Sequence, residues 1–317
     1  MEYLLLLGAC VFFSLQFIFQ KFFEQRTISG LRICLWNVMV CSTIGLIFIF
    51  VKTGELPQNV TSAAFLYAFL YAISGICCSV ASIAAMHCGN VSVITTYCLA
   101  GGMVLPYFYG ILALDENAGL FKWIGILVLC LSLVPAVMVK SEGKEYSKKD
   151  NVWFFLLCMV IFLTNGFVSI FSKMHQISPA AIDENHFLFL SSLVNLSIVI
   201  IVQFVLAAIR AGKGEKNVLR NTFWEIGKTA MSAKLLLLLI ILASSHAICN
   251  AIGNLFSLRC MMTMDASIQF PVLSAVVIIL TAVFGRVIFK EKVTKNTLLS
   301  LILSAAGIAI FGIGGII

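Results

Sequence analysis

The heptapeptide Gly110-Ile-Leu-Ala-Leu-Asp-Glu116 has a counterpart 175 residues later in Gly285-Arg-Val-Ile-Phe-Lys-Glu291. Each copy lies at the end of a long apolar run, and both keep the same Gly-x5-Glu spacing. This recurrence predicts that the chain consists of two related halves. The same 175-residue shift superimposes further identical residues, namely Ser82 on Ser257, Met86 on Met261, Ser92 on Ser267 and Ala100 on Ala275.

The composition indicates whether these halves fold in water or in a membrane. Of the 317 residues, 61% are hydrophobic and 11% are charged, and the mean hydropathy is +1.06. Soluble chains carry about 45–50% apolar and about 25% charged residues, so this chain has too little polar surface to cover a core in water. A soluble enzyme, a nucleic-acid-binding domain, a disordered chain and a disulfide scaffold are therefore excluded.

Ten apolar runs have about the 20 residues that a membrane-spanning helix needs. In lipid each run must be helical, because a spanning segment has to satisfy its own backbone hydrogen bonds. The runs are too long for barrel strands and do not alternate with period two. The sequence thus predicts an all-α integral membrane protein with ten transmembrane helices. The runs cover residues 3–23, 31–51, 63–87, 91–114, 119–139, 152–173, 186–209, 234–259, 266–289 and 296–317.

A charged segment at 140–151 separates five runs from the other five. We therefore expect a first repeat at 1–139, a linker at 140–151 and a second repeat at 152–317. Because five is an odd number, the two repeats must be inverted relative to each other, an arrangement typical of secondary transporters. The longer connection at 210–233 includes residues 222–228, for which an interfacial helix and a plain loop are equally compatible with the sequence.

The spans 92–116 and 267–291, followed by Gly125 and Gly307 in the next runs, resemble the drug/metabolite transporter superfamily, specifically its ten-helix EamA-like transporters. This resemblance extends over the whole chain in helix count and spacing. It implies membrane transport, export as the usual direction, and both termini in the cytoplasm. Substrates vary across such a superfamily, so the resemblance does not name one.

The basic residues give a different orientation. Seventeen of the 21 lysines and arginines fall on the side opposite the termini. The positive-inside rule then places the termini outside the cytoplasm, against the resemblance, and both orientations stay open. Either one predicts a multi-pass protein of the plasma membrane or the bacterial inner membrane.

The run 234–259 contains the most informative polar residues. His246, Asn250 and Asn254 are spaced four apart, which puts them on one face of a helix. The 175-residue shift relates this stripe to the segment of the third run that contains Tyr71 and Ser79. Because polar groups at membrane depth are costly, they face a cavity or a partner helix, and we expect these five residues to bind a substrate.

Other polar residues inside the runs are further candidates for substrate binding. The alternative for each is an interhelical hydrogen bond, which commonly joins transmembrane helices. Asn37 and Asn195 lie near the middle of their runs and belong to the same class. The remaining predicted substrate-binding residues are Gln16, Gln20, Asn165, Ser169, Tyr97 and Gln269.

Charged residues lie at the ends of the runs, and no Asp or Glu lies deep within one. Glu116 and Glu291 are expected to be gate or helix-end residues. Lys21 and Lys173, which a 152-residue shift superimposes, are placed in the same class. They either attract an anion or, as we favour, extend along the helix end to reach the membrane surface.

The lack of buried carboxylates leaves a divalent or lipophilic cation without a counter-charge. The sequence therefore predicts a secondary transporter of a small neutral or zwitterionic metabolite such as an amino acid, moved by alternating access through a central cavity between the repeats. The resemblance implies that the direction is export. His246 is the titratable group that can carry a proton there, or else a neutral structural histidine. The alternatives are a multidrug exporter of the same superfamily and a non-transporting scaffold or sensor.

No nucleophile-base spacing, phosphate loop or metal-ligand cluster indicates an enzyme, a cofactor or a metal. The expected partners are a small-molecule substrate and the lipid bilayer, without nucleic acid. The oligomeric state and the coupling ion do not follow from the sequence.

Overall fold

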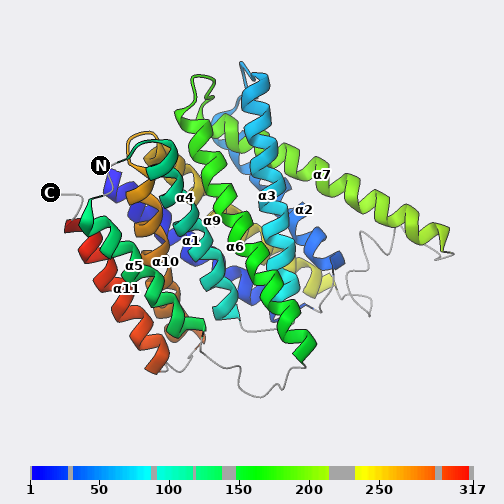
Figure 1. The fold of residues 1–317 in the computed structure, drawn as a ribbon. Coiled ribbons are helices and arrows are strands. Elements are labelled where there is room, and N and C mark those ends of the chain that lie inside the picture. Colours follow the sequence, from blue (N-terminus) through cyan, green and yellow to red (C-terminus); the bar gives the residue numbers. More distant parts are fainter. Residues whose placement is uncertain are drawn as a thin grey trace.

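A computed structural model of the protein describes residues 2–27, 31–86, 91–116, 119–137, 148–213, 233–289 and 295–313. Within these ranges the chain forms ten α-helices and no strand, which confirms the all-α prediction (Figure 1). The predicted segment 222–228 and Glu291 lie outside the described residues. The helices are α1 (Glu2–Glu24), α2 (Leu31–Thr53), α3 (Ser62–Met86), α4 (Val91–Ala113), α5 (Leu120–Val137), α6 (Lys148–Ile177), α7 (Glu184–Gly212), α9 (Ala233–Met261), α10 (Ala266–Phe289) and α11 (Lys295–Ile313).

Eight of the described helices are long and apolar enough to cross a membrane, and α5 contains a shorter apolar stretch, Leu120–Ser132. Large apolar side chains such as Trp153, Leu127 and Leu237 are exposed on the outside of the bundle, where lipid replaces water. The protein is therefore a multi-pass integral membrane protein. The helix limits differ little from the predicted runs, with the largest extension in α6, which begins at Lys148 rather than at residue 152.

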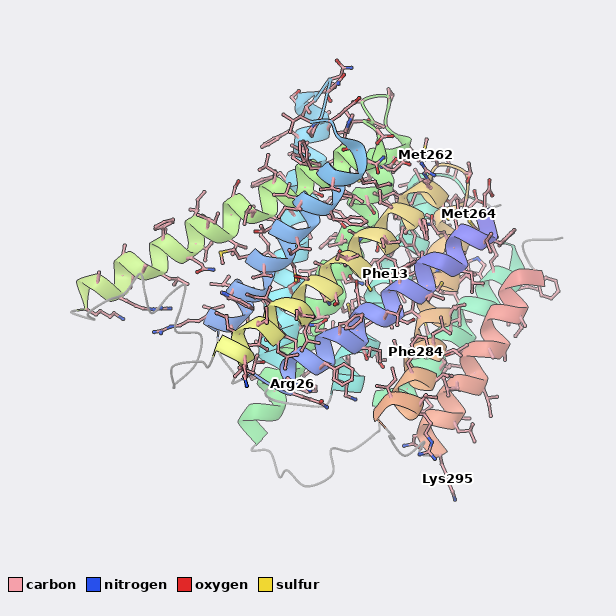
Figure 2. All side chains as sticks on the ribbon, turned by 180° about the vertical axis from the view of Figure 1, so that it is seen from behind. Phe13, Arg26, Met262, Met264, Phe284 and Lys295 are labelled. Carbon is pink, nitrogen blue, oxygen red and sulfur yellow. The ribbon has the colours of Figure 1, made fainter. Side chains whose placement is uncertain are left out.

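The bundle has two ends that can be followed in the figures. The start of α1 and the end of α11 lie together at what we call the terminal end (Figure 1). Met262 and Met264, between α9 and α10, lie at the same end (Figure 2). Arg26 and Lys295 lie at the opposite end, which we call the distal end.

Helices from the two halves alternate in the packing. Helix α1 packs against α9 while α6 packs against α3, and α2 contacts α9 while α7 contacts α3. Helices α4 and α10, α2 and α7, and α5 and α11 pack as pairs. Exchanging the first five helices for the second five reproduces these pairings, as a pseudo-two-fold relation between the halves requires. The inverted relation itself stays a prediction.

Glycines allow α4 and α6 to cross closely. A Cβ atom added to Gly101 would overlap the carbonyl oxygen of Phe162, and one added to Gly166 would lie 2.8 Å from the carbonyl oxygen of Gly101. Small residues are common at such crossings, because association within lipid depends on close backbone packing. The crossing places Asn165 of α6 next to Cys98 of α4, at the wall of the cavity described below.

This crossing predicts a contrast between two helical glycines. Gly101→Ala should lower the unfolding free energy by about 1–3 kcal/mol, because the added methyl group forces two backbones apart. Gly75→Ala is the control, since its added Cβ meets no atom within 4 Å and alanine favours a helix. Thermal unfolding of the detergent-purified variants measures the difference, and equal Tm values for both variants would contradict the crossing.

Candidate functional site

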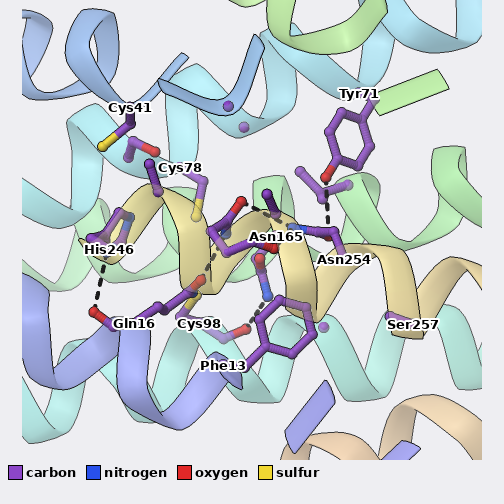
Figure 3. Close-up of a pocket in the computed structure, with 18 of the residues that line it drawn as sticks. Phe13, Gln16, Cys41, Tyr71, Cys78, Cys98, Asn165, His246, Asn254 and Ser257 are labelled. Atoms are coloured by element: carbon purple, nitrogen blue, oxygen red, sulfur yellow. Dashed lines mark hydrogen bonds between the residues drawn. The ribbon is translucent and has the colours of Figure 1, made fainter. Parts of the chain in front are cut away.

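A cavity of about 310 Å³ lies in the middle of the bundle, with walls from helices of both halves (Figure 3). Helices α1, α2, α3 and α4 of the first half and α6, α7, α9 and α10 of the second contribute lining residues. Nine of the eleven predicted substrate-binding residues line it: Gln16, Gln20, Tyr71, Ser79, Asn165, Ser169, His246, Asn250 and Asn254. Their place is thus known, and their role in binding stays a prediction.

Two asparagines of α9 link a tyrosine of α3 to a glutamine of α1 in a continuous chain of hydrogen bonds. We call it the amide chain, and its members are Tyr71, Asn254, Asn250 and Gln16. The Tyr71 hydroxyl donates to Asn254 Oδ1 at 3.2 Å. Asn254 Nδ2 donates to Asn250 Oδ1 at 3.0 Å, and Asn250 Nδ2 donates to Gln16 Oε1 at 2.7 Å (Figure 3). The chain therefore crosses the cavity wall from α3 through α9 to α1 and joins the two halves.

The His246 ring is held in one orientation. Its Nδ1 atom lies 3.1 Å from the backbone carbonyl oxygen of Gln16. Because a carbonyl oxygen can only accept, Nδ1 must carry a hydrogen. In the neutral imidazole the other nitrogen, Nε2, then holds a lone pair.

Polar groups on α6 form another part of the wall. Asn165 Nδ2 donates to the Cys98 carbonyl at 2.7 Å. The hydroxyls of Ser169 and Ser172 donate to carbonyls of their own helix, at 3.3 Å to Asn165 and at 2.8 Å to Ser169. The hydroxyl hydrogens are therefore in use, and only oxygen lone pairs are left for a ligand.

Two predicted residues do not line the cavity, so the candidate site leaves them out. Gln269 is fully buried, and its Nε2 donates to the Ser257 carbonyl at 2.8 Å and to the Ser257 hydroxyl at 3.2 Å. It joins α10 to α9 through interhelical hydrogen bonds, which was the alternative to substrate binding for this residue. Tyr97 packs against an apolar cluster between α3, α4 and α6 that includes Ile94 and Ile161.

Some lining residues were not among the predicted substrate-binding set. Ser82 and Ser257, which the 175-residue shift superimposes, both line the cavity. Asn37 and Asn195, which the sequence had offered as further candidates, line it as well, and Asn195 Oδ1 is buried without a hydrogen-bond partner among the described residues. The repeat was the signal that could have identified the two serines.

Glu116 does not line the cavity. Its side chain caps the start of a helix of the other half. Its two carboxylate oxygens accept from the backbone N–H groups of Ala266 at 2.9 Å and Ser267 at 2.7 Å. These are the first residues of α10, where unpaired N–H groups and the helix dipole favour a negative charge. A methyl group at Gly110 would come within 2.5 Å of Glu116 Oε2, which explains the Gly-x5-Glu spacing.

Lys173 corrects a prediction. We expected it to reach the membrane surface, but its side chain is only 5% exposed and turns inward. Its Nζ donates at 2.8 Å to each of the carbonyls of Met261 and Met264, at the C-terminal end of α9, where cations are favoured. Lys21, its counterpart under the 152-residue shift, is half-buried near the distal end.

Further charged groups gather at the terminal end. Lys122 Nζ lies 3.9 Å from Asp265 Oδ2, and Arg259 Nε lies 2.5 Å from Glu184 Oε1. These four residues, together with Glu116 and Lys173, form what we call the polar seal. Its contacts join α5 and the segment between α4 and α5 to the start of α10. They also join α6 and α7 to the end of α9.

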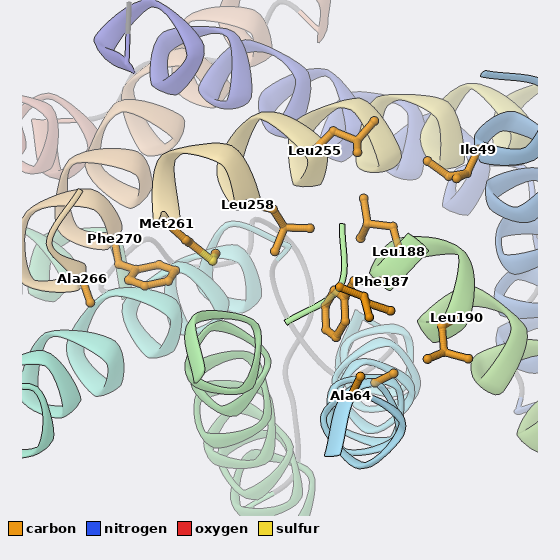
Figure 4. Packing of buried hydrophobic residues seen from close by; sticks show 12 residues of the cluster. Ile49, Ala64, Phe187, Leu188, Leu190, Leu255, Leu258, Met261, Ala266 and Phe270 are labelled. Atoms are coloured by element: carbon orange, nitrogen blue, oxygen red, sulfur yellow. The ribbon is translucent and has the colours of Figure 1, made fainter. Parts of the chain in front are cut away.

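An apolar cluster borders the cavity on the side of the terminal end, and Figure 4 shows its residues. Ile49, Leu188, Met261 and Phe270 belong to this cluster and also line the cavity. All four lie in the turns of their helices that are nearest the terminal end. The cluster therefore forms the wall of the cavity on that side, and the polar seal covers it.

Comparison with known proteins supports the same architecture. Residues 1–138 match the EamA-like transporter family, which confirms the predicted resemblance. A solved structure described only as "Crystal structure of protein" is similar over 98% of this chain and 95% of its own, with a TM-score of 0.66 and 11% identity, a likeness in fold alone. No curated protein matches the chain.

The cap on α10 generates a stability prediction. Glu116→Ala should lower the unfolding free energy by about 0.5–2 kcal/mol, the usual effect of removing a side chain that caps a helix. Gly110→Ala should act in the same direction, because its methyl group displaces the Glu116 carboxylate. Glu55→Ala, at an exposed loop position, is the matched control in thermal unfolding. A loss in Glu55→Ala as large as in Glu116→Ala would refute the capping role.

Proposed function

We propose that this chain, whose residues 1–138 match the EamA-like transporter family, moves a small neutral or zwitterionic metabolite across the membrane. The observation that carries the proposal is a polar cavity between helices of both halves without a charged residue in its described lining. Secondary transporters bind their substrates at such a repeat interface. Family and site both favour transport over catalysis.

The size and lining of the cavity support a small solute. Ligand pockets in proteins usually measure about 300–1,000 Å³, and a volume of about 310 Å³ lies at the lower limit. The lining that the structure describes contains amides, hydroxyls and one imidazole but no Asp, Glu, Lys or Arg. An ion of either sign would enter without a counter-charge, at a high cost in desolvation, whereas a neutral or zwitterionic solute would not.

Two other functions rest on other features. Phe13, Phe17 and Phe270 give part of the cavity an aromatic lining, which would suit a multidrug exporter of lipophilic compounds. A scaffold or sensor would bind a solute in the same cavity without moving it. Purified protein in liposomes separates these functions, because only a transporter exchanges internal for external solute.

Alternating access gives the polar seal a role in the mechanism. In this mechanism the apolar cluster and the polar seal, whose contacts the structure describes, would form the barrier at the terminal end. Opening that end requires the contacts of Glu116 and Lys173 to break. New contacts formed when the distal end closes would offset the free energy of the contacts that are lost. Export as the direction follows the family tendency, and whole-cell efflux of the solute tests it.

The screen for the solute uses binding to the folded state. A ligand that binds only folded protein raises its apparent stability by mass action, by about 2.7 kcal/mol at 100 times its Kd. Detergent-purified protein is therefore screened by Tm against neutral amino acids, nucleobases, sugars and lipophilic quaternary amines at two pH values. Stabilisation by the lipophilic amines alone would favour the multidrug function.

The amide chain gives the test of the site. Asn250→Leu with Asn254→Leu should abolish counterflow of the solute in proteoliposomes, because both the hydrogen bonds and the polar surface of α9 are lost. Gln203→Leu is the control, since this buried amide of α7 does not line the cavity. Transport that survives in the double variant, at unchanged Tm, would eliminate the site assignment.

Proton coupling through His246 is a separate proposal. The other ionisable side chains of the described lining are Tyr71 and the thiols of Cys41, Cys78 and Cys98. Imidazole is the side chain that exchanges protons most readily near neutral pH in water. His246→Asn keeps a donor for the Gln16 carbonyl but cannot carry a proton. We expect counterflow to persist in this variant while uptake driven by a pH gradient is lost. Gradient-driven uptake equal to that of the unmodified protein would rule the proposal out.

A further inference from the structure

The orientation of the amide chain is fixed by a backbone carbonyl. Asn254 Nδ2 lies 2.9 Å from the carbonyl oxygen of Asn250, and a carbonyl can only accept. The nitrogen of the Asn254 side chain must therefore face α9 itself, and its Oδ1 atom must face Tyr71. Because Oδ1 is also only an acceptor, the Tyr71 hydroxyl is the donor in their 3.2 Å bond.

The same reasoning continues to the other end of the chain. Asn254 Nδ2 also meets Asn250 Oδ1 at 3.0 Å, so Asn250 turns its own nitrogen towards Gln16, at 2.7 Å. The Gln16 side chain thus presents its oxygen to α9. Its Nε2 group points away from that bond, and among the described residues no acceptor meets it.

The amide chain is consequently directional, with every hydrogen bond donated in the direction from Tyr71 to Gln16. Bonds aligned in this way polarise one another. At the Tyr71 end the phenolic oxygen has used its hydrogen and offers lone pairs. At the Gln16 end the amide offers two N–H donors. The two ends of the chain have opposite polarity, although no member is charged.

The neighbouring residues extend this polarity along the cavity. On α6, Asn165 directs its nitrogen to Cys98 and keeps the lone pairs of its Oδ1, and Ser169 has used its only hydrogen and offers lone pairs. Ser169 and Tyr71 lie on the terminal-end side of the middle of their helices, and Gln16 lies on the distal-end side of the middle of α1. At the Gln16 end, His246 Nε2 is an exception to this polarity, because it holds a lone pair.

We infer that the cavity binds a solute with N–H donors at one end and a carboxylate or carbonyl acceptor at the other. The N–H end lies against Tyr71 and the wall of α6, and the acceptor end lies against Gln16. This inference rests on the proposed function and narrows its solute class. It excludes N-trimethylated solutes, which have the charge of an ammonium group but no hydrogen to donate, and it excludes diacids, which lack a donor.

The test compares matched solutes. L-alanine, L-serine, L-valine and L-phenylalanine are each compared with their N-trimethyl derivatives and with their amino alcohols, by Tm shift and by competition in proteoliposome counterflow. For those amino acids that bind, N-trimethylation should weaken binding at least tenfold, because the acceptors of the Tyr71 end are left unpaired. Replacing the carboxylate by CH₂OH should also weaken binding. Equal binding of the N-trimethyl derivatives would overturn the inference.

Variants assign each effect to one end. Tyr71→Phe and Ser169→Ala remove acceptor oxygens, and Ser169→Ala leaves no unpaired donor because that hydroxyl bonds its own helix. Both should reduce the discrimination against N-trimethylation and leave the preference for the acid over the alcohol. Gln16→Leu should do the reverse. The opposite assignment, in variants with unchanged Tm, would refute the orientation.

The outcomes also separate this inference from the function on which it rests. Transport of neutral solutes that does not depend on N–H groups would overturn the inference and leave the transporter standing. Protein that binds these solutes but exchanges none across the liposome membrane would refute transport and leave the polarity of the cavity standing. No counterflow and no Tm shift with any probe would count against both.

Discussion

The interior of a membrane offers no water to polar groups, and the rest of this structure depends on that constraint. Helices satisfy their own backbone except at their ends, and a polar side chain at membrane depth is costly unless it finds a hydrogen-bond partner in its own helix or in another. Here Glu116 pairs with the first N–H groups of α10, and Lys173 pairs with the last carbonyls of α9. The same need joins Tyr71 through α9 to Gln16.

Helix α9 connects the polar seal with the cavity. Its C-terminal end is held by Lys173, and its middle presents Asn250 and Asn254 to the solute space. A shift of α9 that opens the terminal end would also move the middle of the amide chain relative to Tyr71 and Gln16, which lie on other helices. Under the proposed function, binding and access would therefore be mechanically linked, as alternating access requires.

Sequence reasoning identified what depends on periodicity and missed what depends on tertiary neighbours. The four-residue spacing of His246, Asn250 and Asn254 was sufficient to place them on one face. A single polar residue such as Gln269 gives no such signal, because a cavity and an adjacent helix are equally compatible with it. Lys173 has the same position at a helix end as Lys21, and only the fold reveals that the end of α9 lies within its reach. The Gly110-to-Glu116 motif was recognised as a repeat, but the partner of Glu116, the start of α10, lies 150 residues away in the chain.

A neutral hydrogen-bonded chain has an advantage over an ionised site in this position. An unpaired charge in an empty cavity would cost several kcal/mol, and a transporter must be stable when empty in every turnover. In the amide chain Asn254 donates to Asn250 and Asn250 donates to Gln16 without a ligand, so no member of the chain is left without a hydrogen bond in the empty cavity. For the proposed solute, affinity would come from a few hydrogen bonds, each worth about 1 kcal/mol net, which would allow the solute to leave as readily as it enters.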